Sequence, residues 1–263
     1  MIGVFDSGFG GLHVLRGIVE HLPEYSYLYL GDSHRAPYGD RPQSEVLEFT
    51  SQGVDFLFQK GAEIVIVACN TASSEALRYI QSPKEGKKVL GVLVPFAEAA
   101  VAISTSRRIG VIATRGTVES NAFVREIVKL IPDALVVQQA CPRLVPLVEA
   151  GEENSELARK LIEEYLQPLL THEIDTLVLG CTHYGILEPL IRTIVGPSVR
   201  IISERDVIPQ KFKEYLNRHP EIESRLQHNR MVRLYSTGNI QAFNALGTRF
   251  FGVPISAQHV VLM

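Results

Sequence analysis

The chain has 263 residues, of which 46% are hydrophobic and 21% are charged, and its net charge is -3 at pH 7. This composition predicts a globular protein with a sizeable core and gives no basic face for nucleic acid. The first residues lack a secretory signal, no stretch is apolar enough to span a bilayer, and three cysteines without a regular framework favour a reducing compartment, so we expect a cytoplasmic protein without membrane or nucleic-acid partners.

The chain opens with an expected strand over residues 2–5, which leads into the glycine-rich turn 6–11 (DSGFGG). Glycines there permit a tight turn and close approach of the backbone to a ligand. A dinucleotide site with Asp32 as the ribose-binding acid is an alternative, although His13 stands where the motif needs its third glycine. A polar Asp-Ser pair at the end of a strand favours contact with a small polar substrate.

Helices and strands alternate through the first part of the chain, as hydrophobic periodicity and breaker residues indicate. The loop 33–40 is rich in hydrogen-bonding side chains, and loops over strand ends are where sites are built. His34 in it is expected to be solvated, and the charged run 82–88 is expected to be a surface turn. The expected helices cover 12–21, 43–60 and 72–80, and the expected strands cover 25–30 and 89–94, the latter ended by Pro95.

Two apolar stretches rich in β-branched residues end at a cysteine. One runs from Ile64 to Cys69 and the other from Thr176 to Cys181. Each reads as a buried strand that ends in a thiol at a strand-to-helix turn. Two such turns that face each other would place one sulfur on either side of a small ligand.

The sequence also indicates an internal duplication. Residues 108–114 (RIGVIAT) echo the first strand and its turn at an offset of 107, and Cys181 follows Cys69 at an offset of 112. Two matches at nearly one offset predict two α/β units that each carry one thiol. Cys141 belongs to neither motif and is expected to be a core residue.

The alternation of strands and helices predicts parallel sheets in an α/β fold with two pseudo-symmetric lobes. The first lobe is expected to comprise residues 1–95 and 206–263 and to carry Cys69, and the second residues 96–205, with Cys181; the site lies in the cleft between them. The further expected elements are helices over 119–130, 156–170, 186–195, 207–218 and 240–250, strands over 135–138, 199–202, 232–235 and 259–262, an apolar segment at 144–150 and a charged linker at 220–230.

A thiolate and a thiol on opposite faces of a carbon atom can take a proton from one face and return one to the other. That exchange inverts a stereocentre and needs neither metal nor organic cofactor. Metal binding by Cys69, Cys181 and His183 is an alternative, but Cys-x-His is a poor zinc spacing. A single cysteine nucleophile would leave the other thiol turn unexplained. A purely structural role for both cysteines is disfavoured by their shared position at strand ends.

A set of motifs spread over nearly the whole chain resembles the glutamate racemase family within the aspartate/glutamate racemases. Any one of these motifs is weak, but their order and intervals together are specific. They are DSG at 6–8, PYG at 37–39, CNTA at 69–72, AT at 113–114, GT at 116–117, Glu149 and GCTHY at 180–184.

The resemblance implies a homodimer that interconverts L- and D-glutamate with two bases and no cofactor, and so supplies D-glutamate for peptidoglycan. Cys69 would remove the α-proton of D-glutamate and Cys181 that of L-glutamate. Asp6 would support Cys69, and His183 and Glu149 would support Cys181. The implied substrate-binding residues are Asp6, Ser7, Pro37, Tyr38, Gly39, Asn70, Thr71, Thr114, Thr117, Thr182 and His183.

The chain departs from the family pattern at Phe9, His13 and Phe123, and Ser203-Glu204 stands where an Asp-Ser pair is expected. The nearest rival activity is an aspartate racemase, which shares the two-thiol plan. Against it stand the Asp-Ser-Gly turn and His183, where that branch tends to carry an acid. A two-lobed amino-acid-binding regulatory protein is the non-enzyme alternative, although such a protein has no need of paired thiols.

Overall fold

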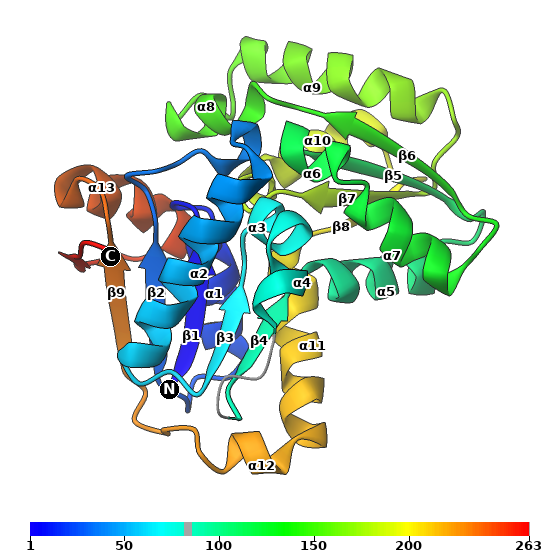
Figure 1. Ribbon diagram of the computed structural model, residues 1–263. Coiled ribbons are helices and arrows are strands. Elements are labelled where there is room, and N and C mark those ends of the chain that lie inside the picture. The colour runs from blue at the N-terminus through cyan, green and yellow to red at the C-terminus, as the bar shows by residue number, and fades with distance from the viewer. Residues whose placement is uncertain (82–85, 263) are drawn as a thin grey trace.

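The computed structural model describes residues 1–81 and 86–262 and contains two parallel sheets flanked by helices (Figure 1). This confirms the predicted α/β class with two sheets. Part of the surface turn expected at 82–88 lies outside the described residues. No helix in the described ranges is long and apolar enough to cross a bilayer.

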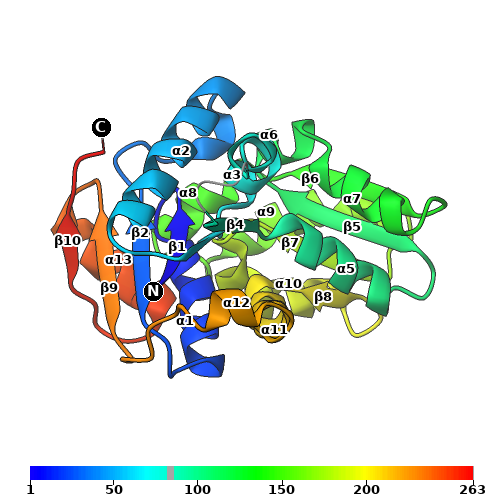
Figure 2. The ribbon, with the colours of Figure 1, turned by 60° about the horizontal axis from the view of Figure 1, so that its bottom comes forward.

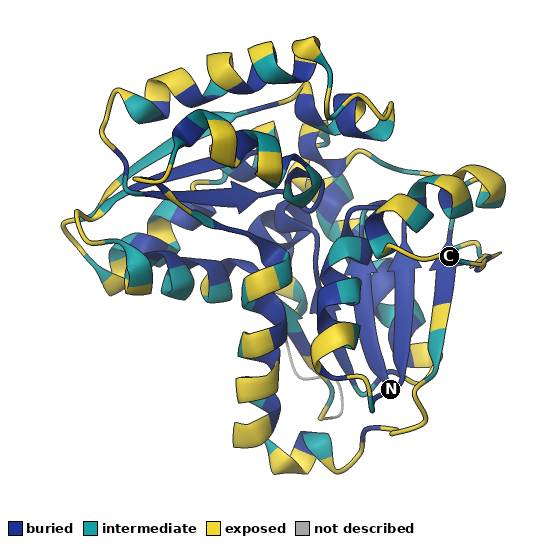
Figure 3. Ribbon diagram, turned by 180° about the vertical axis from the view of Figure 1, so that it is seen from behind, coloured by how far each residue is buried: buried dark blue, intermediate teal, exposed yellow. Residues whose placement is uncertain are grey.

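The first sheet has six parallel strands in the order β10-β9-β2-β1-β3-β4. Its central strands are buried on both faces, as expected of continuous apolar runs in a covered parallel sheet (Figure 3). The two strands of the tail, β9 and β10, extend this sheet, so the tail packs onto the first unit as predicted. The strands are β1 (Ile2–Asp6), β2 (Tyr27–Gly31), β3 (Ile64–Val67), β4 (Lys88–Gly91), β9 (Val232–Ser236) and β10 (Ala257–His259).

The second sheet has four parallel strands in the order β6-β5-β7-β8. This order repeats β2-β1-β3-β4 of the first sheet, with the cysteine-bearing strand third in each set. The repeated order agrees with the two pseudo-symmetric units that the sequence predicts. The strands are β5 (Arg108–Ala113), β6 (Leu135–Ala140), β7 (Thr176–Gly180) and β8 (Arg200–Ile202).

Helices cover both faces of the first sheet, with α2 on one face and α1 and α13 on the other (Figure 2). The long helix α11 packs against α1 of the first unit and α5 of the second. The helices are α1 (Gly11–His21), α2 (Gln43–Gln59), α3 (Asn70–Glu75), α4 (Leu77–Ile80), α5 (Leu93–Ile103), α6 (Arg115–Glu119), α7 (Ala122–Leu130), α8 (Leu144–Glu149), α9 (Glu156–Leu170), α10 (Glu188–Val195), α11 (Glu204–Arg218), α12 (Pro220–Glu223) and α13 (Ile240–Phe251), with short 3-10 turns η1 (Tyr38–Asp40) and η2 (Tyr184–Leu187).

The strand expected at 89–94 ends earlier than predicted, because the chain becomes helical at Leu93. The helix that begins there, α5, was not predicted from the sequence. Pro95 does not stop the chain there. It is the third residue of the helix, where a backbone N–H has no intrahelical partner to lose.

Other boundaries also differ from expectation. The helix expected at 207–218 begins at Glu204, and the one expected at 119–130 is divided into α6 and α7. The helix expected at 72–80 begins at Asn70 and is interrupted at Ala76, where the chain divides into α3 and α4. The last strand is Ala257–His259 and not 259–262, and the linker expected at 220–230 begins with the short helix α12.

Candidate active site

Both cysteines lie at the carboxyl ends of their strands. Cys69 follows β3 by two residues and caps α3, where its sulfur accepts a hydrogen bond from the N–H of Ala72 at 3.5 Å. Cys181 directly follows β7. Both side chains are buried, and each comes from a different sheet.

One small cavity is lined by both thiols and by residues of both units. Its volume is about 30 Å³, which leaves room for water but not for an amino acid. A ligand of that size therefore fits only if the walls of the cavity move. The predicted residues that line it are Ser7, Pro37, Tyr38, Gly39, Cys69, Asn70, Thr71, Thr114, Glu149, Cys181, Thr182 and His183. Gly8, which the sequence gives only as part of the first turn, also lines it, as do Ala36 and Val145, which the sequence did not single out.

Asp6 does not line the cavity, although the sequence predicts it at the site, but it contacts Thr182, which does. Its fully buried carboxylate accepts hydrogen bonds from the N–H of Gly8 at 2.9 Å and from the hydroxyl of Thr182 at 3.4 Å. Burial raises the pKa of Asp6, and the charge of His183 opposes that shift. Asp6 thus joins the first glycine turn to the turn after β7.

The thiol of Cys69 donates a hydrogen bond to Oγ of Ser7 at 3.4 Å. The pKa of Cys69 is raised to about 12: burial is the largest cause and the negative charge of Asp6 adds to it, while hydrogen bonds with Ser7 and Ala72 oppose the shift. Cys69 is therefore a neutral thiol at neutral pH.

Cys181 is accompanied by a histidine–carboxylate pair. Nδ1 of His183 lies 4.0 Å from the sulfur, and Nε2 lies 3.0 Å from Oε1 of Glu149. Burial raises the pKa of Cys181 well above its ordinary value, although a hydrogen bond from the backbone N–H of His183 opposes the shift. A positive charge beside either sulfur would oppose these shifts, because it stabilises a thiolate.

Three threonine hydroxyls bring the two units together beside the thiols. Oγ1 of Thr71 on α3 lies 2.9 Å from Oγ1 of Thr114 and 3.3 Å from Oγ1 of Thr117, at the start of α6. Thr117 is fully buried behind Thr114 and does not line the cavity. Such hydroxyls are suitable donors for a carboxylate.

Tyr38 lines the cavity, but its hydroxyl donates to the carboxylate of Asp32. The same carboxylate accepts from Thr237 at 2.7 Å and from Nε of Arg35 at 2.6 Å. The contacts of Asp32 therefore fix the loop after β2. Its carboxylate is not available to bind a ribose, as the dinucleotide alternative requires.

Two further residues shape the site. A Cβ at Gly10 would lie 2.2 Å from Oγ1 of Thr182 and 2.8 Å from Nδ1 of His183, so only glycine lets these side chains approach the first turn. Glu204 is buried and accepts a hydrogen bond from Nδ2 of Asn70. The role of Gly10 could have been predicted from its position in the glycine-rich turn. For Glu204, the only signal in the sequence was that Ser203-Glu204 replaces the expected Asp-Ser pair.

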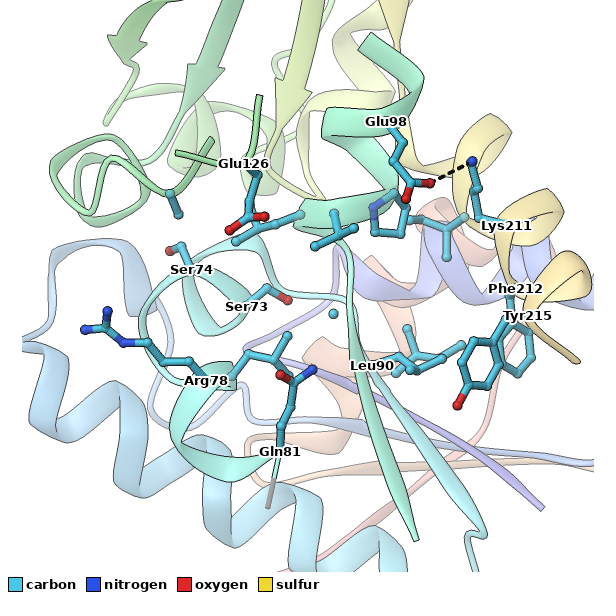
Figure 4. A pocket seen from close by; sticks show the side chains of 18 of the residues that line it. Ser73, Ser74, Arg78, Gln81, Leu90, Glu98, Glu126, Lys211, Phe212 and Tyr215 are labelled. Atoms are coloured by element: carbon cyan, nitrogen blue, oxygen red, sulfur yellow. Dashed lines mark hydrogen bonds and ion pairs between the residues drawn. The ribbon is translucent and has the colours of Figure 1, made fainter. Parts of the chain in front are cut away.

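A larger cavity of about 340 Å³ lies between α3, α4 and β4 of the first unit and α5, α7 and α11 (Figure 4). Glu98 and Lys211 form an ion pair of 2.8 Å at its edge, and Tyr215 and Arg78 lie on opposite sides. Neither cysteine of the strand ends lines it, so it is distinct from the two-thiol cavity.

Comparison with known proteins gives one consistent family. Residues 2–207 match the family described as Asp/Glu/Hydantoin racemase. A glutamate racemase of Streptococcus thermophilus is 39% identical over 261 residues, which cover 99% of this chain and 96% of the relative.

Solved structures agree with the sequence comparison. A glutamate racemase isoform from Bacillus anthracis superposes with a TM-score of 0.93 at 36% identity, covering 100% of this chain and 97% of that one. A glutamate racemase from Francisella tularensis, solved in complex with D-glutamate, gives a TM-score of 0.90 at 29% identity and covers 99% of this chain and 97% of that one.

Proposed function

Because the chain belongs to the Asp/Glu/Hydantoin racemase family, and glutamate racemases match it over nearly its whole length, we propose that it interconverts L- and D-glutamate through two bases, Cys69 and Cys181. The chain is an amino-acid racemase. The observation that supports the two-base assignment is the cavity lined by two thiols that come from the ends of strands in separate sheets.

The substrate itself supplies the charge that activates the site. Both thiols have raised pKa values in the closed cavity. The ammonium group of glutamate lowers the pKa of a neighbouring thiol, because it stabilises the thiolate. A low-dielectric cavity strengthens that effect once water is expelled.

The reaction conserves protons. For L-glutamate, the thiolate of Cys181 takes the α-proton, and the thiol of Cys69 gives its own proton to the opposite face of the carbon. The reverse direction exchanges the two roles. Asp6 supports the proton transfer at Cys69, and Glu149 and His183 support the one at Cys181. Hydroxyl donors around the cavity stabilise the negative charge of the planar intermediate.

The substrate-binding set is the one that the family resemblance implies. The threonine hydroxyls and Ser7 are suitable donors for the carboxylates, and Asp6 attracts the ammonium group. Pro37, Tyr38, Gly39, Asn70, Thr182 and His183 complete the wall. In Tyr38 the contribution comes from the ring, since its hydroxyl is engaged with Asp32.

The remaining proposals follow from the same activity. The protein acts in the cytoplasm as a homodimer and supplies D-glutamate for the peptidoglycan of the cell wall. Its lobes comprise residues 1–95 with 206–263 and residues 96–205. Neither lobe then carries both thiols, so opening and closing of the lobes controls whether a complete site exists.

The test is to incubate purified protein with L- or D-glutamate in deuterated water, without added cofactor. We expect loss of optical rotation and one solvent deuterium at the α-carbon of the inverted product. Racemisation of aspartate in place of glutamate would identify the rival activity, and binding without racemisation would identify a non-enzymatic protein.

Cys69→Ser and Cys181→Ser should each abolish racemisation, because a serine hydroxyl is a far weaker acid than a thiol. Cys141→Ser is the matched control, since the sulfur of this buried cysteine faces the carbonyl of Gln139 and does not line the cavity. Wild-type activity in either of the first two variants would contradict the two-base assignment.

A further inference from the structure

Glu204 is a buried carboxyl group that the reaction described above does not use. It is the first residue of α11 and follows β8 of the second sheet, and 4% of its surface is exposed. It does not line the two-thiol cavity, but its Oε1 accepts a hydrogen bond from Nδ2 of Asn70, which does. The contact connects the end of the second sheet to the residue that follows Cys69.

Asn70 needs such a contact to present a defined surface to a ligand. A carboxamide has a donor side and an acceptor side of nearly the same shape, so rotation by half a turn exchanges them. The side chain is buried, and its Oδ1 has no hydrogen-bond partner among the described residues. The contact with Glu204 therefore determines which side of the amide faces which neighbour.

The surroundings of Glu204 oppose its ionisation. Burial raises the pKa of this carboxyl group well above its ordinary value, and the negative charge of Asp6 raises it further, while the bond from Asn70 opposes the shift. In either protonation state the carboxyl group has an oxygen that accepts from the amide of Asn70, as the contact shows. The negative charge of Glu204 would in turn raise the pKa of Cys181.

We propose that Glu204 is a positioning residue that fixes the side-chain amide of Asn70 through their buried hydrogen bond. Asn70 then keeps its Oδ1 oxygen and its second Nδ2 hydrogen for the polar groups of the bound amino acid. The inference rests on the proposed function, because it assumes that Asn70 contacts glutamate.

The experiment is a double-mutant cycle on the full chain, read as KM and kcat for both enantiomers of glutamate. Glu204→Met removes the acceptor and keeps an unbranched side chain, and Glu204→Gln keeps an acceptor oxygen. We expect Glu204→Met to raise KM for both enantiomers about tenfold, with a smaller change in kcat, because one hydrogen bond that orients the amide is lost. Glu204→Gln should restore most of that loss.

In the Asn70→Ala background, Glu204→Met should cause no further change, since the amide that it positions is absent. An additive loss in the double variant, or an equal loss in Glu204→Gln and Glu204→Met, would overturn the proposal. Glu204→Ser takes the place of Glu204→Met in the same cycle if thermal unfolding shows that the methionine variant does not fold.

Two controls separate this inference from the proposed function. Glu214→Gln changes an exposed carboxylate on the same helix and should behave as wild type. A wild-type protein that does not racemise glutamate contradicts the proposed function. A wild-type protein that does so, while Glu204→Met matches Glu214→Gln, contradicts the positioning role alone.

Discussion

Oε1 of Glu149 lies 3.0 Å from Nε2 of His183, and this contact turns the other ring nitrogen of His183 toward Cys181. Because a carboxylate accepts, Nε2 carries the proton in this contact and Nδ1 is left facing the sulfur. Glu149, His183 and Cys181 thus form a row in which the carboxylate orients the imidazole and the imidazole faces the thiol.

The contact predicts that Glu149→Gln slows proton transfer at Cys181. The equilibrium constant of a racemase is one, so kcat/KM must fall equally in both directions. The asymmetry should instead appear in the isotope effects: the primary deuterium effect with α-deuterated L-glutamate should rise more than that with the D-enantiomer. We expect kcat/KM to fall about tenfold, the size expected for a charged hydrogen bond. Unchanged isotope effects would show that Glu149 does not serve Cys181, and the exposed Glu152→Gln is the control.

Gly10 predicts a second effect on the same side of the cavity. A methyl group at Gly10→Ala would meet Thr182 at 2.2 Å and His183 at 2.8 Å, so both side chains must move. A displacement of this kind should lower kcat/KM about 100-fold. Gly8→Ala is the matched comparison, because its methyl group would meet Ala36 at 3.9 Å, an ordinary contact, and it should cost much less. Equal losses in the two variants would contradict the steric argument.

The hydrogen bond between Tyr38 and Asp32 predicts a loss of stability in Tyr38→Phe. The variant keeps the ring that lines the cavity and removes a buried donor to a carboxylate. We expect the free energy of unfolding to fall by about 1–3 kcal/mol, while KM for glutamate stays close to the wild-type value. Denaturant unfolding and steady-state kinetics measure the two quantities. A large rise in KM with unchanged stability would show that the hydroxyl binds substrate.

Glu75 predicts a pH dependence of stability. This buried carboxyl group on α3 has an oxygen, Oε2, without a hydrogen-bond partner among the described residues. Burial, and then the charge of Glu119, raises the pKa of Glu75 to about 6 from its ordinary value of 4.5. Because the folded-state pKa is the higher one, folding favours the protonated form. The stability that this form contributes is complete below pH 4.5 and is lost as the pH rises through 6.

Glu75→Gln should therefore raise the free energy of unfolding by up to about 2 kcal/mol above pH 6 and have little effect below pH 4.5. Denaturant unfolding across this pH range measures the difference. Glu119→Gln removes only the second cause and should give a smaller gain. A gain that does not vary with pH would contradict the titration of Glu75.

The sequence predicted the elements whose signals are local. The helix α9 begins and ends at the expected residues, because Ser155 caps it and its apolar residues recur at helical spacing. The two thiol strands were evident from β-branched runs that end at small polar residues. The helix α5 was missed because its start is apolar on all sides and carries Pro95, so periodicity could not distinguish it from a strand.

Contacts between distant segments could not be predicted in this way. The expected role of Tyr38 did not anticipate that its hydroxyl donates to Asp32, since both lie in a loop without periodicity. Glu204 reads as a charged residue at a helix start. Its burial against Asn70, 134 positions away, follows only from the packing of the two sheets.

The position of β9 beside β2 has a consequence for synthesis on the ribosome. Residues 108–202 contain the whole second sheet, so all its strands have been made before the tail is synthesised. The first sheet is still incomplete at that stage, because Tyr27–Gly31 gains its outer neighbour only when Val232–Ser236 has been made. Until then the nascent chain presents an unpaired edge of a hydrophobic strand, which is a template for association with other chains. A nascent chain halted before residue 232 therefore carries both thiols and an incomplete first sheet, and we expect it to need a chaperone.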